Sequence, residues 1–355
     1  MPNNAAHDTR TTIQANRLAQ AVGLNVAAMA ALSGGYTITG TGFGTLDQSA
    51  QFFTDFEGQA VGEAVLNEPG KLYKGVSNGT EISDLDTYSG TRCMTHYSQT
   101  STFPKIHLPL SGLSRRAYHS CHFKFTGDDQ RGPEEQNLVW KFSRIGSGQV
   151  YSGLPKATSQ YTSPPGTSYP NSWASAMYSD CGPNRIGTHG GHMGVLDGNI
   201  RDNITNGDWH FYECEFYAGT VDNQDAYFIE RWDGKRTVNF SNRTYLISGL
   251  DDCVQLPTWF ISPICGFDAG HAITKRMNNV FFAEGGARAI MTDSAVYANS
   301  TKWATQPIAT YSNSEVSVTK KRQGFAIGQT AFLHVFNPEG TIVSEGSQLI
   351  VEADA

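Results

Sequence analysis

The sequence predicts a mainly β protein: a two-sheet antiparallel jelly-roll sandwich with an N-terminal helix before it and a small C-terminal β module after it. Many segments alternate apolar and polar residues with a period of two, as half-buried strands do. Turn-forming residues separate these segments, and the 355 residues include 37 glycines. Helical periodicity is confined to the N-terminal part. Many short strands between turns are typical of a sandwich.

The composition argues against several classes of protein. Only 17% of the residues are charged and the formal net charge is −7. Non-specific binding to nucleic acid requires clustered Lys and Arg, so we expect no nucleic-acid partner. No apolar run approaches the roughly 20 residues that a membrane-spanning helix needs, and we expect no membrane span.

The N-terminal segment has the spacing of an amphipathic helix over about residues 11–32, which Gly34-Gly35 would end. The run Leu18–Leu32 also resembles the apolar core of a signal peptide, but polar residues interrupt it. We predict that residues 1–35 form a helical anchor, which either docks on a partner or packs on its own domain. Its apolar stripe consists of Ile13, Leu18, Val22, Val26 and Met29.

The rest of the chain divides into a jelly roll over residues 36–298 and a C-terminal module over residues 299–355. Asn337-Pro338-Glu339-Gly340 is a strong turn signal within that module. About 50 residues are fewer than the ~100 of a full immunoglobulin-like sandwich, so the strand within 36–45 is expected to pair with the module. The predicted strands of the jelly roll lie at 115–126, 138–145, 208–236, 279–282 and 290–297, and a long loop occupies 152–173.

The most informative segment is Asp208–Arg236, which reads as two long strands followed by the tight turn Asp233-Gly234-Lys235. Successive side chains of a strand point to opposite faces of its sheet. One face of each strand is therefore expected to be buried, while the other presents rings and charges of the kind that bind sugars. In the first strand one face carries Trp209, Phe211, Glu213, Glu215 and Tyr217.

Six short motifs follow one another along the chain. They are ITGTGFGT (38–45), Phe56-Glu57-Gly58, W-K-F-x-R-I (140–145), W-x-x-Y-E-x-x-F-Y (209–217), W-D-G-K (232–235) and D-x-x-V-Y (293–297). Their order resembles that of concanavalin A-like and polysaccharide-lyase-like jelly-roll proteins with a small C-terminal immunoglobulin-like module. Such proteins occur among bacterial and phage-encoded surface or virion proteins. The resemblance covers about residues 36–355 and implies a sandwich whose concave sheet meets polysaccharide, without implying that this chain cleaves it.

Lyases of this shape use Tyr, His, Arg, Gln or Lys to neutralise a uronate and to abstract its C5 proton. Tyr118, Ser120, His122 and Lys124 share one face of a predicted strand, and Lys141 or Arg144 would come from the next strand. No catalytic motif of the family matches residue by residue. A His in an alternating strand is more often a packed or solvated side chain, so His122, Tyr118 and Lys141 remain weak catalytic candidates.

Glu213 and Glu215 permit a second reading, as the paired carboxylates of a glycoside hydrolase. Two residues apart on one strand face, their carboxyls would lie about 5 to 7 Å apart, near the separation that a retaining hydrolase needs. Jelly-roll glucanases carry E-x-D-x-x-E, whereas this strand reads E-C-E-F-Y-A. The alternative is two solvated acids paired with Arg231 or Lys235.

No metal or cofactor is expected. His189 and His192 are two ligands without a third, and cysteines in C-x-x-C spacing are lacking. Asp222-Asn223-Gln224-Asp225 could contribute oxygens to a calcium ion, although it lacks the spacing of a dedicated calcium loop. Cys121 and Cys214 are expected to be buried free thiols.

We therefore expect a non-catalytic structural and adhesion protein of a particle, most specifically a bacteriophage virion component that presents its jelly roll to host surface polysaccharide. Its helix or its C-terminal module would bind other virion proteins, and it would form a homo-oligomer; secretion is the alternative location. The alternatives are a polysaccharide lyase or glycoside hydrolase acting on an anionic polysaccharide, and a decoration protein without glycan affinity. The residues expected to contact glycan are Tyr118, His122, Lys124, Lys141, Arg144, Glu213, Glu215, Tyr217 and Trp232.

Overall fold

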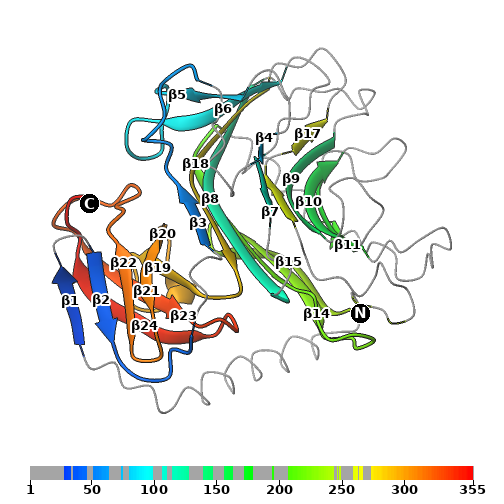
Figure 1. The fold of residues 1–355 in the computed structure, drawn as a ribbon. Helices are drawn as coiled ribbons and strands as arrows, with labels where there is room; N and C mark the ends of the chain where they lie inside the picture. Colours follow the sequence, from blue (N-terminus) through cyan, green and yellow to red (C-terminus); the bar gives the residue numbers. More distant parts are fainter. Residues whose placement is uncertain are drawn as a thin grey trace, which may run out of the picture. The chain divides into compact units, whose positions relative to one another are not determined.

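The structure is a computed structural model in which the chain is mainly antiparallel β, as predicted (Figure 1). It divides into two compact units, which are described separately: unit 1 comprises residues 1–51 and 285–355, and unit 2 comprises residues 52–284. The structure describes residues 28–32, 35–45, 51–63, 73–74, 80–98, 106–109, 114–127, 139–146, 156–162, 172–178, 194–195, 207–243, 246, 248, 259–262, 264–266 and 273–354.

Unit 1 consists of two four-stranded sheets with the strand orders β1-β2-β22-β21 and β20-β19-β23-β24. The first sheet contains β1 (Ala28–Leu32), β2 (Gly35–Thr39), β21 (Ile308–Tyr311) and β22 (Glu315–Thr319). The second contains β19 (Arg288–Thr292), β20 (Trp303–Gln306), β23 (Thr330–Phe336) and β24 (Ile342–Ile350), and a 3-10 turn spans Tyr297–Asn299.

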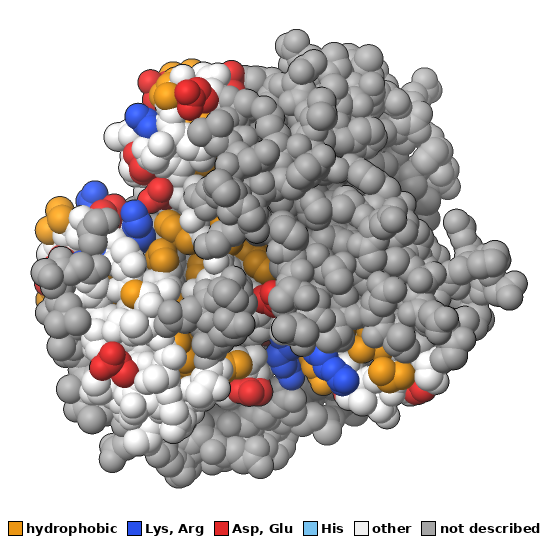
Figure 2. All heavy atoms as spheres, in the orientation of Figure 1, with side chains coloured by type: hydrophobic (Ala, Val, Ile, Leu, Met, Phe, Trp, Pro, Cys, Tyr) orange, Lys and Arg blue, Asp and Glu red, His pale blue; other side chains and the backbone are white. Residues whose placement is uncertain are grey.

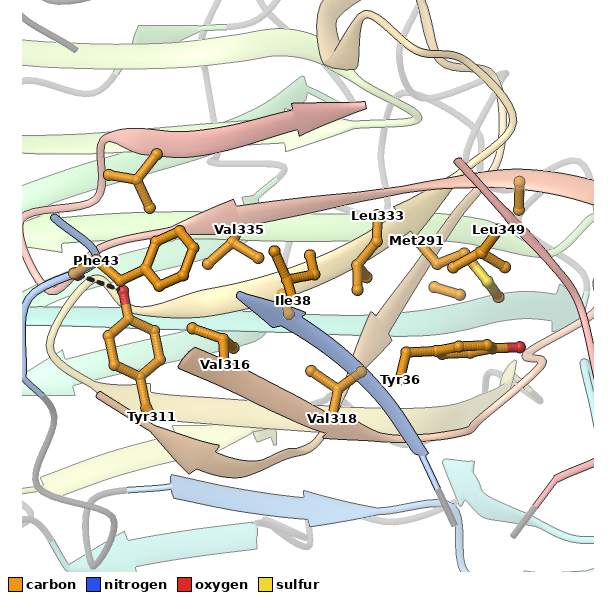
Figure 3. Close-up of a cluster of buried hydrophobic side chains, with 14 of the residues drawn as sticks. Tyr36, Ile38, Phe43, Met291, Tyr311, Val316, Val318, Leu333, Val335 and Leu349 are labelled. Carbon is orange, nitrogen blue, oxygen red and sulfur yellow. Dashed lines mark hydrogen bonds between the residues drawn. The ribbon is translucent and has the colours of Figure 1, made fainter. Parts of the chain in front are cut away.

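One apolar core joins the two sheets of unit 1 (Figure 3). The Tyr311 hydroxyl donates hydrogen bonds to the carbonyls of Phe43 and Phe336, at 2.7 and 3.2 Å, and so satisfies a polar group inside this core. Side chains from both sheets fill the space between them, as close-packed interiors require. The labelled members in Figure 3 are Tyr36, Ile38, Phe43, Met291, Tyr311, Val316, Val318, Leu333, Val335 and Leu349.

The predicted N-terminal helix is wrong where the structure describes it. Residues 28–32 form strand β1, which pairs antiparallel with β2 from Ala28–Thr39 to Leu32–Gly35. The physical reason is that a Gly-Gly pair suits a tight hairpin as well as a helix end. A Cβ on Gly35 would lie 2.1 Å from the Val318 carbonyl oxygen, so this close approach requires glycine. The segment 11–27 lies outside the described residues.

Strand pairing in unit 1 does not follow the expected boundary between the jelly roll and the C-terminal module at residue 298. β19 lies within the predicted jelly roll, but it pairs with β20 and β23 of unit 1. In contrast, β2 pairs with β22, as expected for the strand within residues 36–45. All five residues of β19 are buried, and an all-buried strand has no alternation to show which sheet it joins.

Unit 2 contains two eight-stranded sheets (Figure 1). The β8 sheet has the order β15-β14-β13-β8-β18-β6-β5, with β3 paired to β18. Its strands are β3 (Gln51–Thr54), β5 (Thr80–Ser83), β6 (Cys93–Ser98), β8 (Arg116–Gly127), β13 (His210–Tyr217), β14 (Ala226–Trp232), β15 (Lys235–Arg243) and β18 (Ile273–Glu284).

The second sheet of unit 2, the β9 sheet, has the order β12-β11-β10-β9-β16-β7-β4, with β17 paired to β9. Its strands are β4 (Tyr73–Lys74), β7 (Ile106–Pro109), β9 (Val139–Gly146), β10 (Lys156–Thr162), β11 (Ser172–Tyr178), β12 (Gly194–Val195), β16 (Trp259–Ser262) and β17 (Ile264–Gly266). The sequence placed β9 next to β8, whereas the neighbours of β8 are β13 and β18.

The centre of the β8 sheet contains its longest strands. β8 and β18 are each 12 residues long, and β13 pairs with β8 from His210–Phe123 to Tyr217–Arg116. The Asp208–Arg236 segment forms β13 and β14 joined as an antiparallel pair, as its alternation predicts. Cys93, Cys121 and Cys214 are buried free thiols, which confirms the expectation for the last two. Among the described residues, no helix is long and apolar enough to cross a membrane.

Candidate functional site

The β8 sheet has one face rich in polar side chains, which we call the polar face. Alternation along β8 places Arg116, Tyr118, Ser120, His122 and Lys124 on this face. The strand register sets cross-strand partners beside them. These partners are Phe211, Glu213, Glu215 and Tyr217 of β13, Tyr227 and Arg231 of β14, and Arg276 and Asn278 of β18.

Four residues singled out in the sequence, Tyr118, Glu213, Glu215 and Arg231, meet in one hydrogen-bonded cluster. The Tyr118 hydroxyl donates to Oε2 of Glu213 at 2.9 Å. One nitrogen of Arg231 donates to Oε1 of Glu213 at 3.0 Å and to Oε1 of Glu215 at 2.9 Å. Glu213 is 1% exposed, Glu215 13% and Arg231 14%. Charge-assisted hydrogen bonds of this kind stabilise acids that burial would otherwise penalise.

This cluster argues against the hydrolase reading of Glu213 and Glu215. The two carboxylates of a glycosidase must flank a sugar ring. Here both accept from the same Arg231 nitrogen, so the guanidinium occupies the space between them. The pairing with Arg231 that the sequence offered as the alternative is confirmed, but the two acids are largely buried rather than solvated.

A second group lies at the start of β8, where the polar face is partly exposed. The Arg116 guanidinium sits 4.0 Å from the centre of the Tyr217 ring and 5.6 Å from that of Tyr227. One of its nitrogens donates to the Tyr227 hydroxyl. Tyr217 and Tyr227 are cross-strand partners with ring centres 5.5 Å apart. Cation–π contacts fix the position of a guanidinium, and its other N–H groups can still donate hydrogen bonds to another acceptor.

His122 is buried under a loop rather than presented to solvent. It is 1% exposed, and the Tyr88 ring stacks on it with a centroid distance of 3.7 Å and an interplanar angle of 14°. The Asn279 side-chain nitrogen lies 3.4 Å from Nδ1 of His122. Desolvation and the nearby Asp233 carboxylate raise the pKa of Tyr88 to about 12, so its phenol stays protonated at neutral pH.

The same loop pairs its Asp86 with two cations of the polar face. Nζ of Lys124 lies 3.0 and 2.9 Å from the two carboxylate oxygens of Asp86, and a nitrogen of Arg276 lies 3.7 Å from one of them. Lys124 and Arg276 are cross-strand partners on β8 and β18. Lys124, expected to contact glycan, therefore already binds an anion that belongs to this chain.

Other predicted glycan contacts are not surface groups. Trp232 lies on the opposite face of β14, is 3% exposed and packs on Phe123 and Tyr212. Its indole nitrogen donates to Glu230 at 3.1 Å. Tyr118 is fully buried. Alternation separates the two faces of a strand but does not say which face the rest of the molecule covers.

Lys141 and Arg144 belong to β9, which lies in the other sheet of unit 2. Their strand pairs with β10, β16 and β17, so they do not neighbour Tyr118 and His122 through strand pairing as expected. Their side chains lie outside what the structure describes. The expectation was wrong because consecutive strands of a sandwich commonly belong to different sheets, so neighbours in sequence need not pair.

The Asp222–Asp225 loop uses its carboxylates internally. Oδ1 of Asp222 accepts from the Ser248 backbone at 2.8 Å, and Asp225 accepts from both the backbone and the hydroxyl of Thr220. The hydrogen bond from Ser248 lowers the pKa of Asp222. Within the described part of the chain, no group of three His, Cys, Asp or Glu side chains is arranged to hold a metal. His189 and His192 lie outside that part.

Several residues of the polar face were missed in the sequence. Arg116 precedes Tyr118 by two positions, so the alternation that found Tyr118 could have found it. Arg276 lies on β18, whose predicted length was only residues 279–282. Tyr88 and Asp86 come from the loop between β5 and β6, and a loop has no period that could place them on a sheet.

Comparisons with known proteins give similarity to solved structures. No family model and no curated protein matches the chain. An endo-β-1,4-glucuronan lyase from the fungus Trichoderma reesei is 14% identical over 65% of this chain and 94% of its own, with a TM-score of 0.43. Alginate lyase Aly36B is 13% identical over 66% of this chain and 96% of its own, with a TM-score of 0.45. An alginate lyase from Aplysia kurodai is 10% identical over 58% of this chain and 87% of its own, with a TM-score of 0.41.

These findings correct the expected function. The solved structures named above are polysaccharide lyases, not structural components of virions. The residues expected to contact glycan do not form an open aromatic surface either, since Tyr118, His122, Glu213 and Trp232 are at most 3% exposed. The interpretation as a non-catalytic virion adhesion protein is therefore withdrawn. At these identities and TM-scores, chemistry must be argued from the side chains.

Proposed function

We propose that the chain is a polysaccharide lyase that acts on an anionic polysaccharide. One observation carries the proposal: Arg116, Tyr217 and Tyr227 meet on the partly exposed end of the polar face. The group combines a permanent positive charge with a phenol in hydrogen-bond contact. Elimination from a uronate needs these two functions at one point, because the sugar carboxylate must be neutralised before its C5 proton becomes acidic enough to remove.

The proposed reaction assigns one task to each group. The Arg116 guanidinium binds the uronate carboxylate and stabilises the negative charge that develops when the C5 proton leaves. The Tyr227 oxygen, acting as a phenolate beside the guanidinium, accepts that proton and becomes the phenol. The C4–O4 bond then breaks, a double bond forms between C4 and C5, and the Tyr227 phenol gives the proton to the leaving O4, which restores the phenolate. The Tyr217 ring holds Arg116 in place by its cation–π contact.

The buried cluster next to this group has a supporting task. Glu215 is the cross-strand partner of Tyr118, one row of the sheet away from the Arg116–Tyr217 pair. Arg231, held by Glu213 and Glu215, ties β14 to β13 at a point four residues along β14 from Tyr227. Second-layer contacts of this kind keep reacting groups within the small tolerance that catalysis allows.

Turnover of polyuronates tests the proposal. Incubation with glucuronan or alginate is expected to produce the ultraviolet absorbance of an unsaturated uronate, whereas a neutral β-1,4-glucan gives none. Tyr227→Phe and Arg116→Gln are each expected to lower the rate about a hundredfold or more, because both remove a group from the transition state. Tyr297→Phe removes a tyrosine hydroxyl in unit 1 and serves as the matched control, with an unchanged rate.

Two results would contradict this proposal. New reducing ends without the absorbance would identify a hydrolase, and the Arg116 group would then lose its assigned task. Absence of both signals across a broad panel of uronate polymers, from protein with an intact near-ultraviolet circular dichroism spectrum, would exclude the lyase.

A further inference from the structure

We infer that Lys124 and Arg276 form a binding site for the carboxylate of an anionic sugar, and that Asp86 occupies this site as an internal substitute. The inference rests on the proposed function for the identity of the ligand. It adds a position on the polar face away from the Arg116 group, and it adds a self-blocking contact by the loop that joins β5 to β6.

The geometry of the Asp86 contact is that of a bound carboxylate. Both oxygens of Asp86 lie within 3.0 Å of Nζ of Lys124, and the Arg276 guanidinium approaches one of them at 3.7 Å. The cations are largely covered, with side chains 15% and 12% exposed, while Asp86 is 39% exposed. The anion therefore enters from the solvent side onto two cations that the sheet holds in position.

Lys124 and Arg276 can bind more negative charge than Asp86 alone supplies. Two positive charges face one carboxylate, so the local balance stays positive with Asp86 in place. Arg276 donates one hydrogen bond to the Thr126 hydroxyl at 3.1 Å, and its buried Nε has no acceptor among the described residues. A buried guanidinium nitrogen without a partner is costly and would gain from a second oxygen acceptor.

The loop that carries Asp86 is fastened by contacts that do not involve this carboxylate. Glu57 accepts hydrogen bonds from the backbone nitrogens of Thr91 and Arg92, at 2.7 and 2.9 Å. The Asn278 side chain donates to the carbonyls of Ser89 and Arg92, at 3.0 and 2.9 Å. Removal of the charge of Asp86 should therefore leave the loop in place and free the two cations.

The conservative variant also suits the backbone at this position. Asp86 has φ = 56°, in the left-handed region that Asp and Asn tolerate better than most residues. Asp86→Asn keeps this preference and the shape of the side chain while removing its negative charge. Asp84→Asn makes the same change of charge in the same exposed loop and is the matched control.

Calorimetric titration with a tetraglucuronate, and with the neutral tetraglucose of the same linkage, tests the inference. Asp86→Asn is expected to bind the tetraglucuronate about fivefold more tightly than the unmodified protein, since an ion pair with a partly exposed carboxylate contributes up to about that factor. Asp84→Asn should change the affinity less than twofold. Lys124→Gln and Arg276→Lys are each expected to weaken binding at least about fivefold, and added salt should weaken it in every variant.

The outcomes separate this inference from the proposed lyase activity. Tighter binding by Asp86→Asn without turnover supports the site and leaves the lyase unsupported. Turnover with no difference between Asp86→Asn and Asp84→Asn overturns the site and leaves the lyase standing. Equal binding of the neutral tetraglucose also overturns it, because a site built on two cations must distinguish a uronate from glucose. The double variant Asp86→Asn/Lys124→Gln is used where a variant of a single cation loses its native circular dichroism. It must bind the tetraglucuronate no more tightly than the unmodified protein.

Discussion

At the scale of single residues, the polar face shows how burial changes what a side chain can do. Glu213 and His122 alternate correctly for a surface facing solvent, yet both are 1% exposed. Glu213 is neutralised by Arg231 and accepts from Tyr118, while His122 is stacked beneath Tyr88. The partly exposed Arg116 is better suited to meet a charged substrate, because its donors remain within reach of water.

His119 gives a prediction of acid sensitivity. It is fully buried, Nδ1 lies 3.0 Å from the Phe281 carbonyl oxygen, and desolvation lowers its pKa from 6.5 to about 4. A pKa that is lower in the folded state means that the unfolded chain binds the proton first. Stability is therefore fully present above pH 6.5 and is lost as the pH falls toward 4. The loss from this residue between pH 7 and pH 5 should be about 2 kcal/mol.

Urea unfolding at the two pH values measures this effect. In His119→Asn, an amide nitrogen replaces the ring donor toward Phe281 without a titrating group, so the variant should lose less stability on acidification. Burial also lowers the pKa of His334, which keeps some pH dependence in the variant. An identical acid loss in both proteins would show that His119 does not titrate as proposed.

At the scale of elements, the β1–β2 hairpin depends on a close backbone approach. Gly35 faces Thr319 of β22, and a Cβ at this position would lie 2.1 Å from the Val318 carbonyl oxygen. That oxygen is backbone and cannot move aside without shifting β22. The hairpin therefore has a sequence requirement that neither alternation nor propensity would reveal.

Gly35→Ala tests this requirement. The variant is expected to lower the free energy of unfolding by about 2 kcal/mol, since overpacking by one methyl against fixed backbone costs of that order. Gly58→Ala is the control, because a Cβ there meets nothing within 4 Å. Equal stability of the two variants in chemical denaturation would mean that β2 and β22 are less closely held than the structure indicates.

At the scale of the whole molecule, unit 2 is an insertion into unit 1. Unit 1 is formed by residues 1–51 and 285–355, and its core contains side chains from both segments. β3 begins at Gln51 and β18 ends at Glu284, and these two strands pair with each other. The first and last strands of the inserted segment therefore belong to the same sheet. Such an arrangement lets each unit possess its own core.

Excision of the insertion tests whether unit 1 folds by itself. A chain in which residue 51 is joined to residue 285 through a short Gly/Ser linker should fold, because every residue of this buried core belongs to unit 1. Dispersed amide proton resonances and a cooperative thermal transition are the expected results. A collapsed spectrum without dispersion would show that unit 1 requires unit 2 to fold.

The charge distribution belongs to the same scale. On the face drawn in Figure 2, the exposed Lys, Arg, Asp and Glu side chains of the described residues are scattered among neutral ones and do not gather in a large patch of one sign. The proposed uronate contacts are accordingly local, built from pairs such as Lys124 and Arg276. Affinity for an anionic polymer should then depend on a few placed cations rather than on the net charge.

The sequence alone predicted the mainly antiparallel β fold, the β13–β14 pair, the buried thiols at Cys121 and Cys214, and the shared strand face of Tyr118, His122 and Lys124. These follow from alternation, which is a local property of the chain. The helix at residues 28–32 was wrong, because small apolar residues before Gly-Gly fit a helix and a hairpin strand equally well, and only pairing with β2 decides between them.

Tertiary structure alone decided which face of the β8 sheet is covered, which sheet contains β9, and which residues meet Arg116 and Lys124. Asp86 and Tyr88 reach the polar face from a loop whose position depends on Glu57 and Asn278, far away in the sequence. Periodicity fixes the direction of each side chain relative to its own strand. The identity of its neighbours depends on long-range pairing and loop anchoring, and no single stretch of the chain contains that information.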